Sequence, residues 1–345
     1  MGLQFKEIVV KKEISIKELH GKILAVDAMN LLYQFLTTIR APDGSPLTDK
    51  NGKVTSHLIG LFYRTTSLMG SGLKLAFVFD GKAPEIKQKT WEKRTQIKAE
   101  ASLKLKEAAE AENIEDMRKY ASRTAILTPE MKEEAKKLLH ALGLPVIPAP
   151  SEGEAQTAYM VKSGRAYASV SQDYDNLIFG CPLLIRNLSL EGKRKKAGKF
   201  AYETVKPEML LLSEVLSNLK LDIDQLIVLA ILVGTDYNPG GVKGIGPKKG
   251  LKLLHQHGHG FEKIFAEVEW SKHYPELSWK EIFDTIKHIP VTDDYKLDWN
   301  KVDEKEVLKL LVEEHGFSEE RVKERLEKLK SSSTQFGQKG LGSFW

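Results

Sequence analysis

Cysteine is almost absent from this 345-residue sequence, in which Cys181 is the only one. A single thiol excludes an internal disulfide framework and a zinc site built from cysteines, and it fits a reducing compartment. Long apolar runs are missing too: the longest, Ile227 to Val233, is far too short to span a bilayer. The N-terminus lacks the apolar core of a signal peptide. We therefore expect a soluble intracellular protein without a membrane partner.

What the sequence does contain is typical of a globular protein. The hydrophobic fraction is 41%, and the length allows two domains or one large core with insertions. The net charge is +5 and the isoelectric point is about 8.9. A mildly basic chain with basic patches is compatible with a polyanionic partner, although this inference is weak alone.

Three short apolar runs lead to an acidic residue. Residues 23–26 precede Asp27, residues 75–79 precede Asp80, and residues 167–170 lead to Asp173. Short β-rich runs alternating with helical stretches predict an α/β fold with a central, mostly parallel, twisted sheet flanked by helices. Ligand sites in such sheets form beyond the carboxyl ends of the strands, where these acids would lie.

Two further pairs of acids are spaced by two residues: Glu152 with Glu154, and Asp173 with Asp175. On an extended segment, residues two apart point to the same face, so each pair could aim at one point. Converging carboxylates repel one another unless a cation lies between them, and an all-oxygen set favours Mg²⁺ or Mn²⁺. The alternative, ordinary turn acids and helix caps, is the better interpretation of any one of them alone.

Other segments differ in composition. Residues 82–140 are helical in composition and crowded with charge, whereas residues 223–233 predict an apolar helix. Residues 183–190 and 199–205 predict a hairpin joined by a basic loop. The Gly-rich segment 241–249 has the pattern of a helix-hairpin-helix, in which Gly244 and Gly246 let the backbone approach a phosphate. Lys248 and Lys249 would add charge without reading bases.

Four segments resemble the structure-specific 5′-nucleases, and among these the archaeal flap endonuclease-1 family. They are VFDGKAPEIK from Val78, PSEGEAQ at 150–156, SQDYDNLIFG at 171–180 and GTDYNPGGVKGIGPKK at 234–249. The resemblance covers essentially the whole chain in the right order. It implies a PIN-like 5′-nuclease fold with a helical arch insertion and a helix-hairpin-helix that grips duplex DNA and binds K⁺.

The resemblance also implies roles for individual residues. Two Mg²⁺ ions, for which Mn²⁺ can substitute, would be held by seven acids. Those nearer the first ion are Asp27, Asp80, Glu152 and Glu154, and those completing the second site are Asp173, Asp175 and Asp236. Lys87 and Arg94 match a basic catalytic pair on the scissile phosphate. Tyr33 matches an aromatic residue that stacks on a base, and Arg64 matches a position near the DNA; by pattern alone, Tyr33 would be a core residue.

The C-terminal residues 338–345 resemble the peptide that docks on the sliding clamp PCNA. Gln338, Leu341, Phe344 and Trp345 fit its pattern, and a Ser/Gly-rich segment that we expect to be flexible precedes them. The basic residues that often follow this peptide are missing.

The expected regions follow from these motifs. They are an N-terminal nuclease region 1–98, an arch 82–130, an intermediate region 116–258 that includes the helix-hairpin-helix 234–256, a C-terminal helical region 259–330 and a tail 331–345.

By resemblance, the chain would cut 5′ flaps at single-strand/duplex junctions, with 5′–3′ exonuclease activity, in Okazaki-fragment processing and repair. It would act as a monomer, in the cytoplasm of an archaeon or the nucleus of a eukaryote. A relative specialised for bubbles, Holliday junctions or RNA is one alternative. A DNA-binding scaffold that tethers the clamp is the other, and the complete set of acids argues against it.

Overall fold

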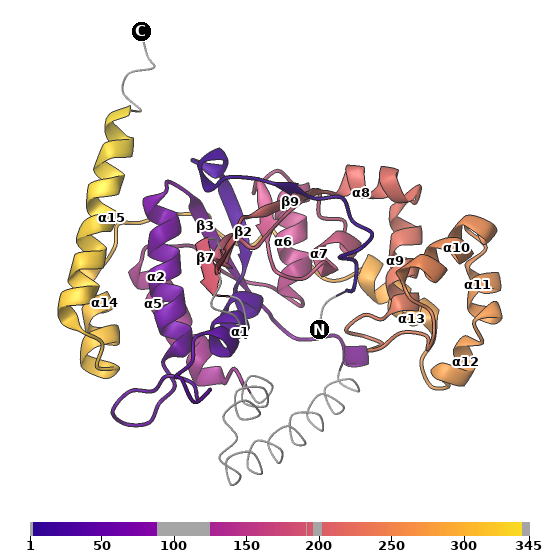
Figure 1. The fold of residues 1–345 in the computed structure, drawn as a ribbon, viewed down its shortest axis with the longest axis horizontal. Helices are drawn as coiled ribbons and strands as arrows, with labels where there is room; N and C mark the ends of the chain where they lie inside the picture. The colour runs from indigo at the N-terminus through magenta and orange to yellow at the C-terminus, as the bar shows by residue number, and fades with distance from the viewer. Residues whose placement is uncertain (1–2, 88–124, 191, 196–201, 340–345) are drawn as a thin grey trace.

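The central element is a seven-stranded sheet (Figure 1), seen in a computed structural model that describes residues 3–87, 125–190, 192–195 and 202–339. In spatial order its strands are β1 (Lys12–Glu13), β9 (Glu208–Leu211), β6 (Leu183–Arg186), β5 (Ala168–Val170), β2 (Ile23–Asp27), β3 (Lys74–Phe79) and β4 (Val146–Pro148). Strands β2 to β6 pair in parallel, and β9 is antiparallel to both of its neighbours. The predicted mostly parallel sheet is confirmed.

The strands that lead to Asp27, Asp80 and Asp173 are neighbours. Strand β2 lies between β5 and β3, and Val26 is opposite both Val170 and Phe77. All three strands are buried almost throughout, as their apolar sequences require. Because parallel strands end at the same edge, the sequence correctly predicts that these acids share one edge of the sheet.

Helices flank the sheet. They are α1 (Ala28–Thr38), α2 (Ser56–Gly70), α5 (Pro129–Ala141), α6 (Gly153–Lys162), the short α7 (Asp175–Ile178) and α8 (Leu212–Leu219), with 3-10 turns at Ile16–Leu19 and Leu188–Leu190. Helix α6 packs on β2, β3 and β5, and α1 packs on β2 and β3. Both helices begin directly after a residue of the acidic set, so the packing of α1 and α6 fixes where those acids lie.

A second apolar core surrounds α9 (Ile223–Val233), which has the bounds predicted from the sequence. Asp222 and Gln225 form a capping box at its start. Around it lie α10 (Pro247–His257), α11 (Phe261–Glu267), α12 (Trp270–His273) and α13 (Trp279–Lys287), at the right of Figure 1. Stacked and edge-on rings of Phe265, Trp270 and Trp279 hold these short helices together.

The predicted hairpin is wrong in its pairing. Strand β6 pairs with β9, whereas the hairpin is formed by β7 (Gly192–Lys195), inside the expected loop, and β8 (Tyr202–Val205). The reason is burial: Leu183, Leu184 and Ile185 are all buried and take their place in the main sheet. The charged segment after them cannot enter that core.

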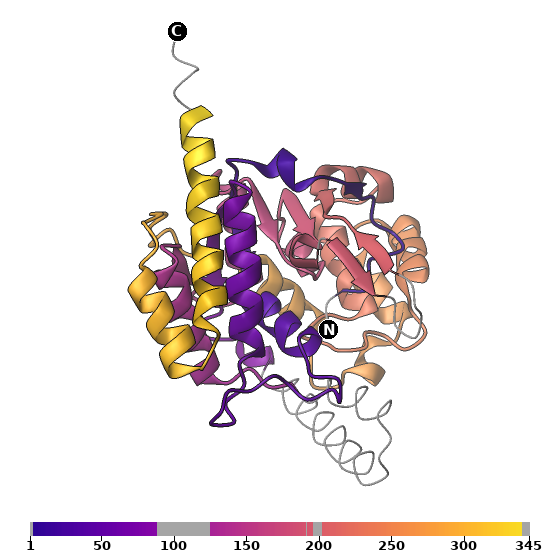
Figure 2. The same ribbon diagram turned by 60° about the vertical axis from the view of Figure 1, so that its left-hand side comes forward.

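The C-terminal region also differs from expectation. After α14 (Glu304–Leu308) and a π-helical stretch (Lys309–Glu314), helix α15 runs from Glu319 to Lys339, beside α2 in Figures 1 and 2. The expected flexible segment from residue 331 is therefore helical as far as Lys339. Ser331 and Ser332 donate their hydroxyls to the carbonyls four residues before them, at 2.9 Å each, which keeps these serines compatible with a helix.

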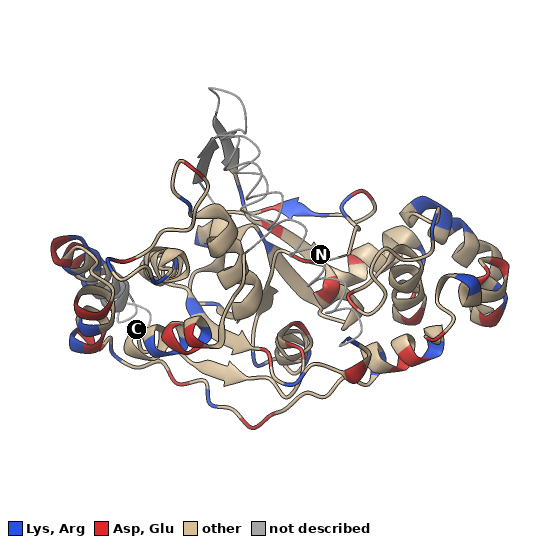
Figure 3. Ribbon diagram, turned by 90° about the horizontal axis from the view of Figure 1, so that it is seen from below, with Lys and Arg blue, Asp and Glu red and all other residues tan. Residues whose placement is uncertain are grey.

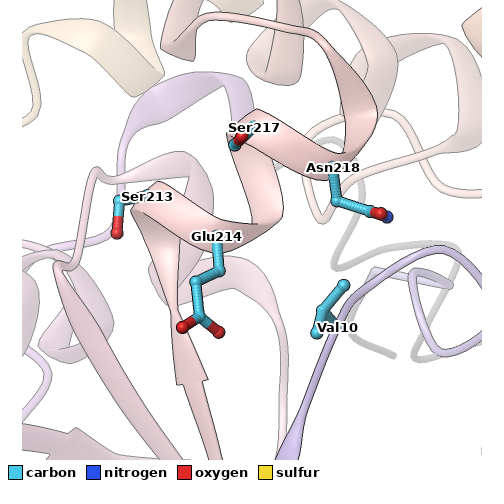
Figure 4. A pocket seen from close by; sticks show the side chains of 5 residues that line it. All are labelled: Val10, Ser213, Glu214, Ser217 and Asn218. Atoms are coloured by element: carbon cyan, nitrogen blue, oxygen red, sulfur yellow. The ribbon is translucent and has the colours of Figure 1, made fainter.

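Surface features outside this architecture are few in the described residues. No helix there is long and apolar enough to cross a bilayer. Acidic and basic residues are interspersed on the C-terminal helices, at the left of Figure 3. A pocket of about 430 Å³ lies between α8 and the N-terminal segment (Figure 4). It is lined by Val10, Ser213, Glu214, Ser217 and Asn218, none of which belongs to the acidic set.

Candidate active site

The seven predicted acids lie at element ends around one edge of the sheet. Asp27 ends β2, Asp80 follows β3, and Asp173 follows β5. Glu152 and Glu154 lie at the start of α6, Asp175 is the first residue of α7, and Asp236 follows α9. Asp236 therefore comes from the second core, and α7, which carries Asp175, packs between α6 and α9.

From the sequence, the two i, i+2 pairs are expected on extended segments. They lie instead at helix starts. Glu152 is the N-cap of α6 and Glu154 lies in its first turn. Asp175 likewise begins α7, two residues after Asp173. Neither helix start has a side-chain capping hydrogen bond, so the spacing by two reflects positions at helix starts rather than strand alternation.

Asn30 connects acids that are distant in the sequence. Its backbone N–H donates to Asp27 Oδ1 at 3.0 Å, and its side-chain Nδ2 donates to Asp173 Oδ2 at 2.8 Å. Its Oδ1 accepts from the backbone N–H of Gln172 at 3.0 Å. One amide therefore fixes both the start of α1 and the loop that carries Asp173.

Other polar groups fix the remaining acids. The Ser171 hydroxyl lies 3.3 Å from Glu154 Oε1 and 3.5 Å from Asp27 Oδ2. Gly153 N–H donates to Asp80 Oδ1 at 2.7 Å, and the N–H of Leu3 donates to Asp175 Oδ1 at 2.9 Å. These bonds hold the carboxylates although several of them are buried.

Lys87 lies among the acids. Its Nζ is 2.6 Å from Glu152 Oε2 and 3.3 Å from Asp236 Oδ2. Burial lowers the pKa of Lys87, but Glu152 and Asp236 together raise it above its ordinary value, so the ammonium stays charged. The predicted catalytic lysine is thus brought to the acidic cluster.

The electrostatics of the cluster show crowding of like charges. Burial, followed by the nearby Asp80 and Asp173, raises the pKa of Asp27 well above its ordinary range. Burial and then Asp175 and Asp27 do the same to the pKa of Glu154. Burial and then Asp236 raise the pKa of Asp175 to about 7. Without a cation, some of these groups hold protons at neutral pH.

The donor set suits hard divalent cations, because all seven side chains offer carboxylate oxygen. Glu152 Oε1 is buried and has no hydrogen-bond partner, so one acceptor already lacks its positive counterpart. Among the described residues, no three His, Cys, Asp or Glu side chains are close enough to enclose an ion as they stand.

Sequence reasoning missed three polar residues at this site: Asn30, Ser171 and Tyr237. The Tyr237 hydroxyl is buried without a partner, and burial followed by Glu152 and Asp236 raises its pKa well above the ordinary value. Each of the three lies within three residues of a predicted acid. That proximity is the signal that could have found them, although it does not distinguish a polar neighbour that points inward from one that points outward.

The predicted DNA-contacting residues lie on α1, on α2, and on α10 with the loop before it. Tyr33 on α1 is 37% exposed, contrary to a core position, and Arg64 lies on α2. Gly244 has φ +85° in the loop before α10, and Gly246 is the N-cap of that helix, with Pro247 in its first turn. Lys248 and Lys249 follow and are exposed.

Several predicted residues lie outside the described part of the chain. They are Arg94, Leu341, Phe344 and Trp345, and of Gln338 only the helical backbone is described. The predicted arch at 82–130 is likewise described only up to Lys87 and from Ala125 onward.

Comparisons with known proteins agree with this site. The XPG N-terminal domain matches residues 2–101, which include Asp27 and Asp80, and the XPG I-region matches residues 143–236, which include the other five acids. A solved structure of flap endonuclease-1 from Methanococcus jannaschii has a TM-score of 0.73 and 41% identity, covering 97% of this chain and 99% of that one. The catalytic core of Rad2 in complex with a DNA substrate has the same fold, with a TM-score of 0.69 at 24% identity, covering 95% of this chain and all of the other.

Curated relatives match over the full length. Flap endonuclease 1 of Pyrococcus horikoshii is 51% identical over 345 residues, covering all of this chain and 98% of the relative. That of Aeropyrum pernix is 48% identical, covering 95% of this chain and 94% of the relative. Identity at this level over whole chains, on a matching fold, means that the protein belongs to the flap endonuclease 1 family.

Proposed function

We propose that the protein cuts 5′ flaps at single-strand/duplex junctions by two-metal phosphodiester hydrolysis. The observation that supports this most directly is that the seven acids lie at neighbouring element ends, several with raised pKa values, and that Lys87 pairs with two of them, Glu152 and Asp236. Asp27, Asp80, Glu152 and Glu154 would hold one Mg²⁺ ion. Asp173, Asp175 and Asp236 would complete the site of the other, and Mn²⁺ could replace either.

The bound ions would lower the pKa of the attacking water and stabilise charge on the phosphate and leaving oxygen. The chain's own residues supply the rest. Asn30 and Ser171 hold Asp27, Glu154 and Asp173 in fixed orientations. Lys87 would neutralise the scissile phosphate together with Arg94.

Substrate selection would rely on shape. Exposed Tyr33 would stack on a base of the DNA next to the cut, which any base satisfies, with Arg64 near the backbone. Gly244 and Gly246 would bring the backbone to a phosphate of the duplex, with Lys248, Lys249 and a K⁺ ion balancing charge. These contacts recognise structure and charge rather than sequence.

The biological setting is proposed from the family. The protein would act in Okazaki-fragment processing and repair as an intracellular, soluble monomer with additional 5′–3′ exonuclease activity. Residues 338–345 would bind the PCNA clamp through Gln338, Leu341, Phe344 and Trp345.

Replacement of Asp175 tests the active site. Asp175→Ala should lower cleavage of 5′-labelled flap DNA in Mg²⁺ by more than about a hundredfold, because a carboxylate at the metal would be lost. Asp298→Ala, which removes an exposed acid between α13 and α14, is the matched control and should cut like the wild type. Normal cleavage by Asp175→Ala would show that the site has been assigned to the wrong residues.

A further inference from the structure

The ion pairs of Lys87 join two acids that belong to different proposed metal sites. The ammonium is 2.6 Å from Glu152 Oε2 and 3.3 Å from Asp236 Oδ2. The side chains are 11% exposed for Lys87, 8% for Glu152 and 21% for Asp236. Charges so poorly hydrated are stable only with close partners, so Lys87 stabilises the charges of Glu152 and Asp236 in the absence of DNA.

This arrangement satisfies the acids only in part. Glu152 Oε1 stays buried without a hydrogen-bond partner. The Lys87 ammonium carries one positive charge and neutralises the acids only in part. A divalent cation carries two charges and could replace it.

We propose that Lys87 is a built-in counter-ion that competes with the metal ion for Glu152 and Asp236 until DNA arrives. The inference rests on the proposed metal site and deepens it. The phosphodiester of DNA gives the Lys87 ammonium another anionic partner. A divalent cation gives the two carboxylates a partner of higher charge. After the exchange, Lys87 would pair with the phosphodiester and the two acids with the metal ion, so none of the three charges would lack a partner.

The local structure allows this exchange through the side chain alone. The Lys87 N–H donates to the Pro84 carbonyl at 2.9 Å, in a helical segment that begins at residue 85. A lysine has a long flexible stem on a compact charge, so its ammonium can move several ångströms while the backbone stays in place.

The proposal has a thermodynamic consequence. If DNA draws Lys87 from the acids, DNA raises the affinity for the metal, and the metal raises the affinity for DNA by the same factor. The DNA-free protein would then bind divalent cations more weakly than the DNA-bound protein.

Calcium titration of the DNA-free protein tests the proposal without relying on cleavage. Lys87→Gln, followed by calorimetry at pH 8, should bind Ca²⁺ about tenfold or more tightly than the wild type, because the competitor is gone. Lys87→Arg retains the charge and should bind like the wild type. Lys132, on α5, lies near Asp80, and Lys132→Gln removes an equal charge. This variant controls for long-range electrostatics, and its Ca²⁺ affinity should differ from that of the wild type by less than about threefold.

The outcomes separate this inference from the proposed function. Asp175→Ala must weaken Ca²⁺ binding; if it does not, the seven acids are not the metal site and both proposals fail. If Asp175→Ala weakens binding but Lys87→Gln binds no more tightly than the wild type, only the counter-ion proposal is overturned. Thermal unfolding checks that Lys87→Gln is folded, and the rise in Tm caused by Ca²⁺ should be larger for this variant than for the wild type.

Discussion

Asn30 shows how a single neutral side chain organises a charged site. Its three hydrogen bonds, of 2.8 to 3.0 Å, reach Asp27, Asp173 and the backbone of Gln172. A donor aimed at one carboxylate oxygen leaves the other oxygen to a different partner. Asn30 therefore sets the direction in which Asp173 presents its remaining lone pairs.

We expect Asn30→Ala to slow flap cleavage by about 10- to 100-fold and to raise the Mg²⁺ concentration needed for half-maximal rate, because residues that orient metal ligands have effects of this size. Gln34→Ala, one turn later on α1, is the control: Gln34 accepts from Ser189 and has no contact with the acids in the described bonds. A rate loss with unchanged Mg²⁺ dependence would contradict the orienting role.

The raised pKa of Asp175 makes a prediction about stability without metal. Its folded-state pKa is about 7 against an ordinary 3.8, so the unfolded chain releases this proton first as the pH rises. Ionisation of Asp175 should therefore destabilise the metal-free fold between about pH 4 and pH 7, by roughly 4 kcal/mol, since each pKa unit is worth about 1.36 kcal/mol. Asp175→Asn should remove most of that loss.

Urea unfolding in EDTA at pH 5 and at pH 8 measures this difference. The midpoint of the wild type should fall more between the two pH values than that of Asp175→Asn. An equal fall in both proteins would show that Asp175 is already ionised at pH 5 in the metal-free fold.

At this scale, the sequence predicts the acids better than their surroundings. Asp27 and Asp80 are recognisable because each follows an apolar strand, and strand ends have a fixed place in a parallel sheet. Asn30, Ser171 and Tyr237 have no such pattern, because the direction of a polar side chain depends on the packing of the helix or loop that carries it. The placement of Lys87 on Glu152 and Asp236 depends on contacts 65 and 149 residues away and is equally invisible in the sequence.

At the scale of elements, two glycines in and after the loop between α9 and α10 allow backbone strain and DNA contact to be tested separately. Gly244 has φ +85°, whereas Gly246 has φ −95°, which any residue adopts. A Cβ added to either glycine would meet no atom within 4 Å. The two positions therefore differ in conformation but not in space.

Gly244→Ala should destabilise the fold by about 1 kcal/mol, because the left-handed region is unfavourable for alanine. Gly246→Ala should unfold like the wild type but bind flap DNA several-fold more weakly, since its methyl group would keep a phosphate from the start of α10. Fluorescence anisotropy in Ca²⁺ gives the affinity, and thermal unfolding gives the stability. Wild-type affinity for Gly246→Ala would exclude close backbone approach at this glycine.

Elements with strong local signals are the ones that the sequence predicts correctly. Helix α9 has an apolar run and a capping box, and α10 has Pro247 directly after its N-cap. The β6 pairing is a different case, because Leu183 to Ile185 have two possible partners nearby in sequence. Only the burial of the whole strand in the sheet decides between them.

Across the whole molecule, the tail is joined to the nuclease by a helix. Helix α15 is fastened to α2, where Arg325 donates to Thr66 Oγ1 at 2.8 Å and to the Tyr63 carbonyl at 2.9 Å. It continues to Lys339, directly before the last six residues of the chain. Any partner of the tail would thus be held at the end of a semi-rigid support.

Deletion of residues 338–345 should abolish stimulation of cleavage by the clamp and leave cleavage without the clamp unchanged, because the deleted segment is remote in sequence from every proposed catalytic residue. Cleavage assays with and without PCNA measure both effects. A second test is the double variant Phe344→Ala with Trp345→Ala, which should behave like the deletion. Stimulation that survives both changes would remove the docking proposal.

The distribution of the acids along the chain also matters while the protein is being made. Asp27 and Asp236 are separated by 209 positions, and the sheet joins β1, near the N-terminus, to β9 at Glu208–Leu211. Such long-range pairing forms late in folding, after the intervening chain exists. Under the proposed assignment, a nascent chain that stops before residue 236 lacks one of the seven acids that would hold the metal ions.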